Sequence, residues 1–229
     1  MSRSTFAPLA AVTLAALLTA CGSSSTDSGT TTAAGQCSQV AAAQPQPGRQ
    51  HLTAPTASLP KGSVWNLKVD TNCGSFVIQV KSSLSPKAAA SVVGLAKSGF
   101  YDALPIHRIS PGFVIQGGDP ATNGSGGPGY TTVDTPASNT AYSRAIVAMA
   151  KTGADPAGAA GSQFFVVTGE AAQLPPDYAV LGVVVTGMET VDRISAQPID
   201  PATTQGGGQA DGAPAKPIVI QKITVTRVS

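Results

Sequence analysis

The segment SVWNLKVDTNCGSFVIQV (residues 63–80) constrains the fold most, because it alternates apolar and polar residues on both sides of a Thr-Asn-Cys-Gly turn. A period of two predicts extended strands, and two such runs around a tight turn predict a β-hairpin. Further strands are expected at FVIQGG (113–118), AIVAMA (145–150), SQFFVVTG (162–169), YAVLGVVV (178–185) and PIVIQKITVTRV (217–228). Most of the regular structure should therefore be β-sheet.

Two segments have the pattern of helices. Ser85 as N-cap, Pro86 at the first helical position and Gly99 as the stop predict a helix over residues 87–98. A second, short helix is expected over residues 187–196, where apolar residues recur at helical spacing.

The composition favours a single β-rich domain. With 229 residues, of which 42% are hydrophobic, the chain is long enough for one good core. Its 25 glycines and 18 prolines suit many tight turns rather than a helical bundle. Many strands with two helices predict a closed antiparallel β-barrel capped at its ends. From the pattern alone, a two-layer α+β sheet is the alternative.

The chain begins with the pattern of an export signal. Arg3 precedes an apolar run over residues 6–18, which is too short to span a bilayer and is typical of a cleaved signal peptide. The tetrad LTAC, ending at Cys21, resembles a bacterial lipobox, in which the cysteine becomes the lipidated first residue. We therefore expect a lipoprotein signal peptide over residues 1–20 and an exported protein that Cys21 anchors to the outer face of the cytoplasmic membrane. An ordinary signal peptide with an incidental cysteine is the alternative.

The residues that follow predict a tether. Residues 22–36 are rich in Ser, Thr and Gly, and residues 43–62 are mostly polar and punctuated by proline, so neither segment can build a core. We expect a flexible tether over residues 21–62, with a root-mean-square reach on the order of 35 Å. The ordered domain should then occupy residues 63–229.

Two cysteines remain after Cys21, namely Cys37 and Cys73. In an exported protein they are most simply interpreted as one disulfide that closes the end of the tether onto the domain. Two free or intermolecular thiols are the alternative, because the sequence supplies no geometry.

Charge and motifs exclude several classes of function. The formal net charge is +2, and loss of Arg3 from the 14 basic residues leaves 13 against 12 acidic ones, so no electrostatic affinity for nucleic acid is expected. His51 and His107 form no cluster at metal-ligand spacing, and no G-x-S-x-G elbow occurs. The run GSGGPG (124–129) matches G-x-G-x-x-G, but no helix pattern follows it, so a surface loop is predicted rather than a dinucleotide site.

Three separated segments resemble the cyclophilin family of peptidyl-prolyl cis-trans isomerases: GFYDALPIHRISPGFVIQGGDP (99–120), MAKTGADPAGAAGSQFFVV (149–167) and LGVVVTGMETVDRI (181–194). They occur in family order, and the resemblance runs from about residue 63 to the C-terminus. It implies an eight-stranded antiparallel barrel capped by two helices, cis/trans exchange at X-Pro bonds, proline-containing polypeptide substrates, no cofactor or metal, and a monomer. With the export signal, this predicts a lipid-anchored bacterial isomerase that assists the folding of exported proteins.

The chemistry of this reaction suits the residues present. An X-Pro bond prefers trans by only about 0.5–1 kcal/mol, but exchange is slow because amide resonance must be broken. Since no proton is transferred, catalysis needs groups that bind the twisted amide better than the planar one. As the bond twists, the proline nitrogen regains its lone pair and can accept a hydrogen bond. A permanently charged, planar donor such as Arg108 fits that task.

The resemblance also assigns the other site residues. Gln116 donates to a substrate carbonyl and orients Arg108, and Phe113 completes the catalytic set. On pattern alone, Phe113 and Phe165 would be residues of the barrel core. His107 has a supporting role, because the reaction needs no general base. An apolar slot takes the proline ring and further residues line the groove beside it, so the substrate-binding set is Phe113, Val114, Phe165 and Leu174 for the slot, and Ala150, Lys151, Gln163 and Tyr178 for the groove.

The sequence departs from the family's pattern at three of these neighbouring positions. Gln173 stands where many members have a tryptophan that contacts cyclosporin, Tyr178 replaces a frequent histidine, and Lys151 replaces a common asparagine. The competing hypothesis is a non-catalytic chaperone or surface module that binds proline peptides on the same fold. A secreted antioxidant or hydrolytic enzyme is a weaker alternative, because the metal and nucleophile patterns are missing.

Overall fold

The computed structural model describes residues 36–204 and 210–229. The predicted signal peptide, lipidated Cys21 and the first part of the predicted tether lie outside the described residues. None of the helices in the described part of the chain has the length and hydropathy that a membrane crossing requires.

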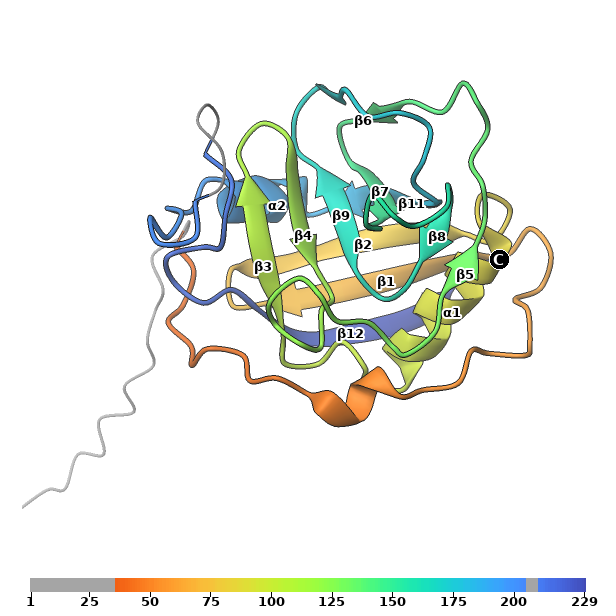
Figure 1. The fold of residues 1–229 in the computed structure, drawn as a ribbon, viewed down its shortest axis with the longest axis horizontal. Coiled ribbons are helices and arrows are strands. Elements are labelled where there is room, and N and C mark those ends of the chain that lie inside the picture. The colour runs from red at the N-terminus through yellow and green to blue at the C-terminus, as the bar shows by residue number, and fades with distance from the viewer. Residues whose placement is uncertain (1–35, 205–209) are drawn as a thin grey trace, which may run out of the picture. The chain divides into compact units, whose positions relative to one another are not determined.

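Eight strands of the described chain close into a barrel, in the spatial order β1-β12-β3-β4-β9-β7-β11-β2 (Figure 1). Every neighbouring pair in this ring is antiparallel. The predicted fold class is therefore confirmed, and the two-layer alternative is wrong. The barrel strands are β1 (Val64–Thr71), β2 (Gly74–Lys81), β3 (Leu104–Ser110), β4 (Val114–Gly117), β7 (Ile146–Met149), β9 (Phe164–Val167), β11 (Val180–Thr186) and β12 (Val219–Arg227).

Short strand pairs lie in the connections between the barrel strands. β5 (Thr132–Val133) pairs with β8 (Ala159–Ala160), and β6 (Tyr142–Ser143) pairs with β10 (Ala171–Ala172). Each pair ties two of the long loops together.

The hairpin of β1 and β2 follows its hydrophobic alternation. Leu67 and Val69 are buried in the barrel, whereas Lys68 between them is exposed, as a period of two requires. Gly74 closes the turn with φ +117°, and a Cβ at this position would lie 2.9 Å from the Thr190 hydroxyl. Glycine is required here for both conformation and space.

Helices α1 (Pro86–Lys97) and α2 (Met188–Ser195) pack against the barrel, close to their predicted ranges. Ser85 is the N-cap residue of α1, as predicted, but its side chain makes no capping hydrogen bond. Instead, the backbone N–H of Ala88 donates to the Asp134 carboxylate over 2.7 Å. An ionised carboxylate is a stronger acceptor than a hydroxyl and also complements the positive end of the helix.

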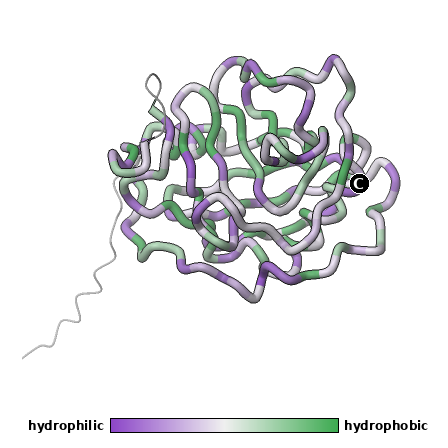
Figure 2. The backbone as a smooth tube through the Cα atoms, viewed as in Figure 1, coloured by the Kyte–Doolittle hydropathy of each residue, from purple (hydrophilic) through white to green (hydrophobic). Residues whose placement is uncertain are grey.

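Apolar side chains form two clusters on opposite faces of the sheet. Along β4 and β9, Ile115 and Val166 point into the barrel core, whereas Val114 and Phe165 belong to a second cluster on the outer face. Figure 2 shows hydrophobic stretches gathered towards the middle of the molecule, with more hydrophilic loops around them. The second cluster lies outside the barrel, so the connections after β5 and β9 cover it from solvent.

Residues 36–62, here called the strap, run along the outside of the barrel and contain the short 3-10 helix η1 (Pro47–Gln50) (Figure 1). A disulfide with an S–S distance of 2.06 Å joins Cys37 to Cys73 in the β1–β2 turn. Next to it, Ser38 donates from its backbone N–H to the carbonyl of Asn72 over 2.8 Å. The expectation of a free tether as far as Gly62 does not hold for the strap.

The strap is held along its length by hydrogen bonds to backbone carbonyls. The Arg49 guanidinium donates to the carbonyls of Phe100 and Asp102, over 2.7 and 2.6 Å. The backbone N–H groups of Gln46 and Leu52 donate to the carbonyls of Pro120 and Pro128. These last two bonds hold both ends of residues 120–128, here called the glycine-rich loop, which borders the candidate site.

Candidate active site

Arg108 lies on β3, directly opposite Gln116 on β4. Its Nη1 donates to the Gln116 Oε1 over 3.0 Å, as expected if Gln116 orients the guanidinium. β3 is a strand that the sequence analysis did not predict, because Pro105 within it weakens the strand pattern. The ladder with β4 nevertheless fixes the position of Arg108.

A single row of side chains crosses the outer face of the barrel. Arg108 on β3 faces Gln116 on β4, Gln116 faces Phe165 on β9, and Phe165 faces Ala148 on β7. Directly opposite residues of an antiparallel ladder project to the same face. The row therefore passes within three strands from a cation, through an amide, to an aromatic ring.

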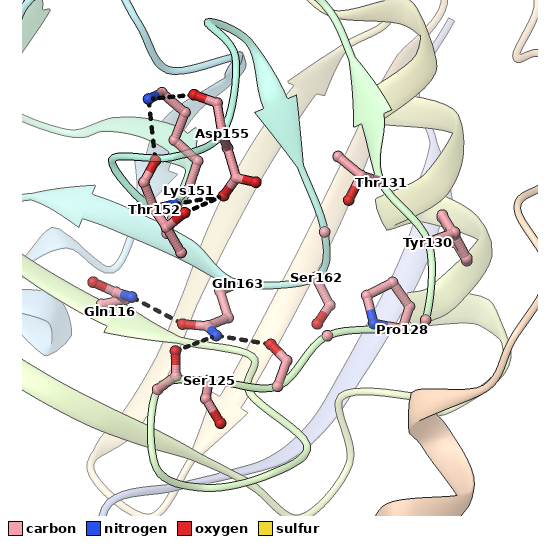
Figure 3. A pocket seen from close by; sticks show the side chains of 16 residues that line it. Gln116, Ser125, Pro128, Tyr130, Thr131, Lys151, Thr152, Asp155, Ser162 and Gln163 are labelled. Atoms are coloured by element: carbon pink, nitrogen blue, oxygen red, sulfur yellow. Dashed lines mark hydrogen bonds between the residues drawn. The ribbon is translucent and has the colours of Figure 1, made fainter.

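Gln116 also connects to the glycine-rich loop (Figure 3). Its Nε2 donates to the Gln163 Oε1 over 2.9 Å, and the Gln163 Nε2 donates to the carbonyls of Gly124 and Gly126 over 2.9 and 2.8 Å. The fully buried carboxylate of Asp119 holds the same loop by accepting three of its backbone N–H groups. Each amide thus has one defined orientation, set by the loop.

Asp211 is a contact of Arg108 that sequence reasoning missed. The Arg108 Nε and Nη2 donate to the two carboxylate oxygens of Asp211, over 2.7 and 2.6 Å. The pair is partly buried, with 35% of the Arg108 side chain and 25% of the Asp211 side chain exposed. The two residues are 103 positions apart in the sequence, so no local pattern connects them.

The structure brings the predicted slot residues together. They belong to the outer-face cluster, in which Phe165 makes an edge-to-face contact with Tyr178 at 5.4 Å between ring centroids. Ala148, Tyr142 and Ala172 are buried in the same cluster. The predicted residues found there are Phe113, Val114, Ala150, Phe165, Leu174 and Tyr178.

Tyr142 is a second residue that the sequence did not single out. Its hydroxyl donates to the carbonyl of Tyr178 over 2.7 Å and accepts the N–H of the same residue over 2.9 Å. Burial raises the pKa of Tyr142, so the hydroxyl stays protonated and keeps both bonds. Tyr142 therefore fixes the backbone that carries the Tyr178 ring.

A hollow of about 480 Å³ lies next to the row, between the glycine-rich loop and the loop after β7 (Figure 3). Four predicted residues line it: Gln116, Ala150, Lys151 and Gln163. Lys151 is 5% exposed in its side chain and lies 3.2 Å from the Asp177 carboxylate, so it braces the wall rather than reaching into solvent. Arg108, Phe165 and Tyr178 are not part of the hollow's lining. Ala150 belongs both to the lining and to the outer-face cluster, so the hollow adjoins that cluster.

His107 lies outside the hydrogen-bonded network of Arg108. Both of its ring nitrogens are buried, and neither has a hydrogen-bond partner within the described part of the chain. Burial lowers the pKa of His107; the nearby charge of Asp119 opposes this effect and that of Arg108 adds to it. A neutral ring without partners fits the supporting role expected from the sequence.

The site offers one fixed cationic donor beside an apolar surface. Over residues 36–204 and 210–229, no three His, Cys, Asp or Glu side chains are grouped so that they could hold a metal ion. The arrangement can bind a hydrophobic ring on Phe165 and its neighbours while the Arg108 guanidinium donates to an atom beside that ring.

Comparisons with known proteins give one consistent result. A family model described as "Cyclophilin type peptidyl-prolyl cis-trans isomerase/CLD" matches residues 66–225. "Peptidyl-prolyl cis-trans isomerase A" of Mycobacterium tuberculosis is 33% identical over 172 residues, which cover 68% of this chain and 89% of that protein. "Peptidyl-prolyl cis-trans isomerase-like 2" of Cryptococcus neoformans is 36% identical over 163 residues, which cover 69% of this chain. The chain spans only about a quarter of the fungal relative, 26% of its length.

Solved structures agree with the barrel. The crystal structure of a cyclophilin-type peptidyl-prolyl cis-trans isomerase from Cryptosporidium parvum has a TM-score of 0.63 and 29% identity, and the match covers 72% of this chain and 99% of that one. A crystal structure of the same protein in the presence of the dipeptide Ala-Pro has a TM-score of 0.62 and 30% identity, with 70% and 98% covered.

Proposed function

Because the chain belongs to the cyclophilin-type peptidyl-prolyl cis-trans isomerases, we propose that it catalyses the cis/trans exchange of X-Pro bonds, with Arg108 as the catalytic donor. The observation that carries this proposal is the row on the outer face of the barrel. It sets a fixed guanidinium one strand away from Gln116 and two strands away from the Phe165 ring.

The row matches the two parts of the substrate. The proline ring packs against Phe113, Phe165 and the rest of the apolar cluster, while an Arg108 N–H donates to the proline nitrogen as the bond twists. One well-aimed donor of this kind is worth about 3 kcal/mol, or roughly two orders of magnitude in rate. Gln116 donates one of its two amide N–H groups to Gln163 and keeps the other for a substrate carbonyl.

The substrates are proline-containing polypeptides. The Ala-Pro dipeptide named with the crystal structure of the Cryptosporidium relative supports this class of ligand. An extended peptide needs a groove on either side of the proline, and the hollow beside Gln116 and Ala150 supplies one. The enzyme works as a monomer, since the row is complete within one chain.

We also propose that the protein is exported, anchored by lipidated Cys21, and active on proteins that fold outside the cytoplasm. The lipobox-like LTAC tetrad supports the anchor. The Cys37–Cys73 disulfide supports a location outside the cytoplasm, since such bonds persist in oxidising surroundings. The strap then begins 15 residues after the lipidated cysteine in the sequence.

The activity is tested with a proline-isomerisation assay on the full chain, in detergent. We expect Arg108→Ala to lower kcat/KM roughly a hundredfold. Arg227→Ala is the matched control, because Arg227 is an exposed arginine on β12 whose guanidinium contacts Ser229 and the Trp65 ring and no residue of the row. An inactive unsubstituted chain that still binds proline peptides would support the non-catalytic binding module instead. Equal rates for Arg108→Ala and the unsubstituted chain would contradict the role of Arg108.

The anchor is tested by Cys21→Ser and membrane fractionation. Loss of the lipidated residue should move the protein from the membrane to the soluble fraction, because no other acyl chain is expected to hold it. Ser23→Ala, two residues further on, serves as the control and should stay membrane-bound. A Cys21→Ser variant that remains in the membrane fraction would show the lipobox interpretation to be wrong.

A further inference from the structure

The loop between α2 and β12 is built to present Asp211 to the active site. Ile109 on β3 and Gly212 form a two-way backbone bridge, with N···O distances of 2.8 and 3.1 Å. A Cβ at Gly212 would lie 2.9 Å from both Ile199 and Thr203, so the loop backbone is packed closely at this point. Since Ile109 follows Arg108, the bridge places Asp211 beside the guanidinium.

The same loop is held by contacts that do not involve the Asp211 side chain. The backbone N–H of Ala213 donates to the Thr203 hydroxyl over 2.9 Å, and that of Asp200 donates to the Ala213 carbonyl over 2.9 Å. The N–H of Ala215 donates to the Pro198 carbonyl over 2.8 Å. Among the described residues, the Asp211 carboxylate bonds only Arg108, and other contacts hold the loop beside it.

Three hydrogen bonds fix the plane of the Arg108 guanidinium. Asp211 accepts from Nε and Nη2, and Gln116 accepts from Nη1. A guanidinium has five N–H groups. Two therefore remain, one on each terminal nitrogen, and neither has an acceptor among the described residues. These two are the donors available to a substrate.

The geometry points to Asp211 as a positioning residue that holds the Arg108 guanidinium in the orientation used on the proline nitrogen. This inference rests on the proposed function. An arginine side chain has several rotatable bonds, and a bidentate carboxylate restricts them before the substrate arrives. Because the carboxylate also reduces the net positive charge near the proline nitrogen, its benefit lies in orientation and not in a stronger field. Without Asp211, the guanidinium would be held only by the bond from its Nη1 to Gln116 and could rotate about that bond.

A double-mutant cycle on the full chain tests this inference. We expect Asp211→Ala to lower kcat/KM about tenfold, mostly through kcat, because the apolar cluster that binds the proline ring is untouched. In an Arg108→Ala background the same substitution should have no further effect. Asp211→Glu should recover part of the loss, since it restores the carboxylate. Asp192→Ala is the control, because both Asp192 carboxylate oxygens accept from the Arg144 Nη2 and neither residue belongs to the row.

A second readout does not depend on activity. The Nε–H signal of Arg108 in NMR spectra should exchange slowly with water in the unsubstituted chain and fast in Asp211→Ala. Equal kcat for Asp211→Ala and the unsubstituted chain, or an equal loss with and without Arg108, would overturn the inference. A faster Asp211→Asn variant would also overturn it, because the carboxylate would then act only by damping the charge. An inactive unsubstituted chain would instead overturn the proposed function.

Discussion

The site is held by two different kinds of structure. Strands β3, β4 and β9 set Arg108, Gln116 and Phe165 in one row, through continuous antiparallel pairing of their backbones. The outer segments act through separate contacts: the strap, joined to the β1–β2 turn by a disulfide, holds the glycine-rich loop. That loop holds Gln116 through Gln163, and Asp211 holds Arg108.

This difference determines how each region responds to damage. A ladder fixes position cooperatively, so a substitution in a strand costs packing energy but leaves the register in place. A loop that depends on individual contacts can be released by the loss of one of them. The strands should therefore determine stability and binding, and the outer segments should determine how well the site is ordered.

The largest expected effect separates the two faces of β9. Phe164 and Phe165 are 2% and 4% exposed, on the core side and on the outer side respectively. Either Phe→Ala substitution should lower the free energy of unfolding by about 3–5 kcal/mol, measured by chemical denaturation. Only Phe165→Ala should also weaken the binding of a proline peptide, because only its ring lies in the row. Equal losses of affinity in both variants would contradict the assignment of the outer face to the substrate.

A smaller effect is expected from cutting the strap loose. Cys37→Ala removes the disulfide to Cys73, and we expect the free energy of unfolding to fall by about 3 kcal/mol. The strap should become sensitive to limited proteolysis while the far-UV circular dichroism of the barrel is retained. Treating the unsubstituted chain with a reductant is the control and should give the same shift. If neither treatment changes stability or cleavage, the strap is held by its hydrogen bonds alone.

The strands and the outer segments also differ in how well the sequence predicts them. The hairpin, α1 and the outer-face cluster depend on local periodicity or on a motif, so residues such as Phe165 and Gln116 could be identified before the structure was known. Asp211 could not, because its partner Arg108 is 103 residues away and a lone Asp after a glycine run has many uses.

The strap escaped prediction for another reason. Two of its contacts join backbone N–H groups to the carbonyls of Pro120 and Pro128, and backbone contacts leave no side-chain pattern. A polar, proline-punctuated sequence therefore predicts flexibility even where the chain lies ordered on a surface. Tyr142 was missed similarly, since its two bonds are both to the backbone of Tyr178.

The smallest expected effect concerns His107, which lies next to the row in the sequence but outside its hydrogen bonds. Burial lowers the pKa of His107 below the 6.5 of a histidine in water. As the pH falls, the unfolded chain therefore binds a proton at this residue before the folded chain does. Stability should therefore be complete above about pH 6.5 and decline below it, until the folded-state pKa is reached.

This decline can be separated from the titration of carboxylates. The pKa values of Asp70 and Asp155 are lowered from 3.8, so neither group titrates between pH 5 and 7. Denaturation curves over that window should flatten in His107→Asn, since asparagine cannot take up the proton. His51→Asn, which removes the other histidine from an exposed place on the strap, is the control and should retain the slope. A slope that disappears in His51→Asn and persists in His107→Asn would place the pH sensitivity in the strap, against the supporting role given to His107.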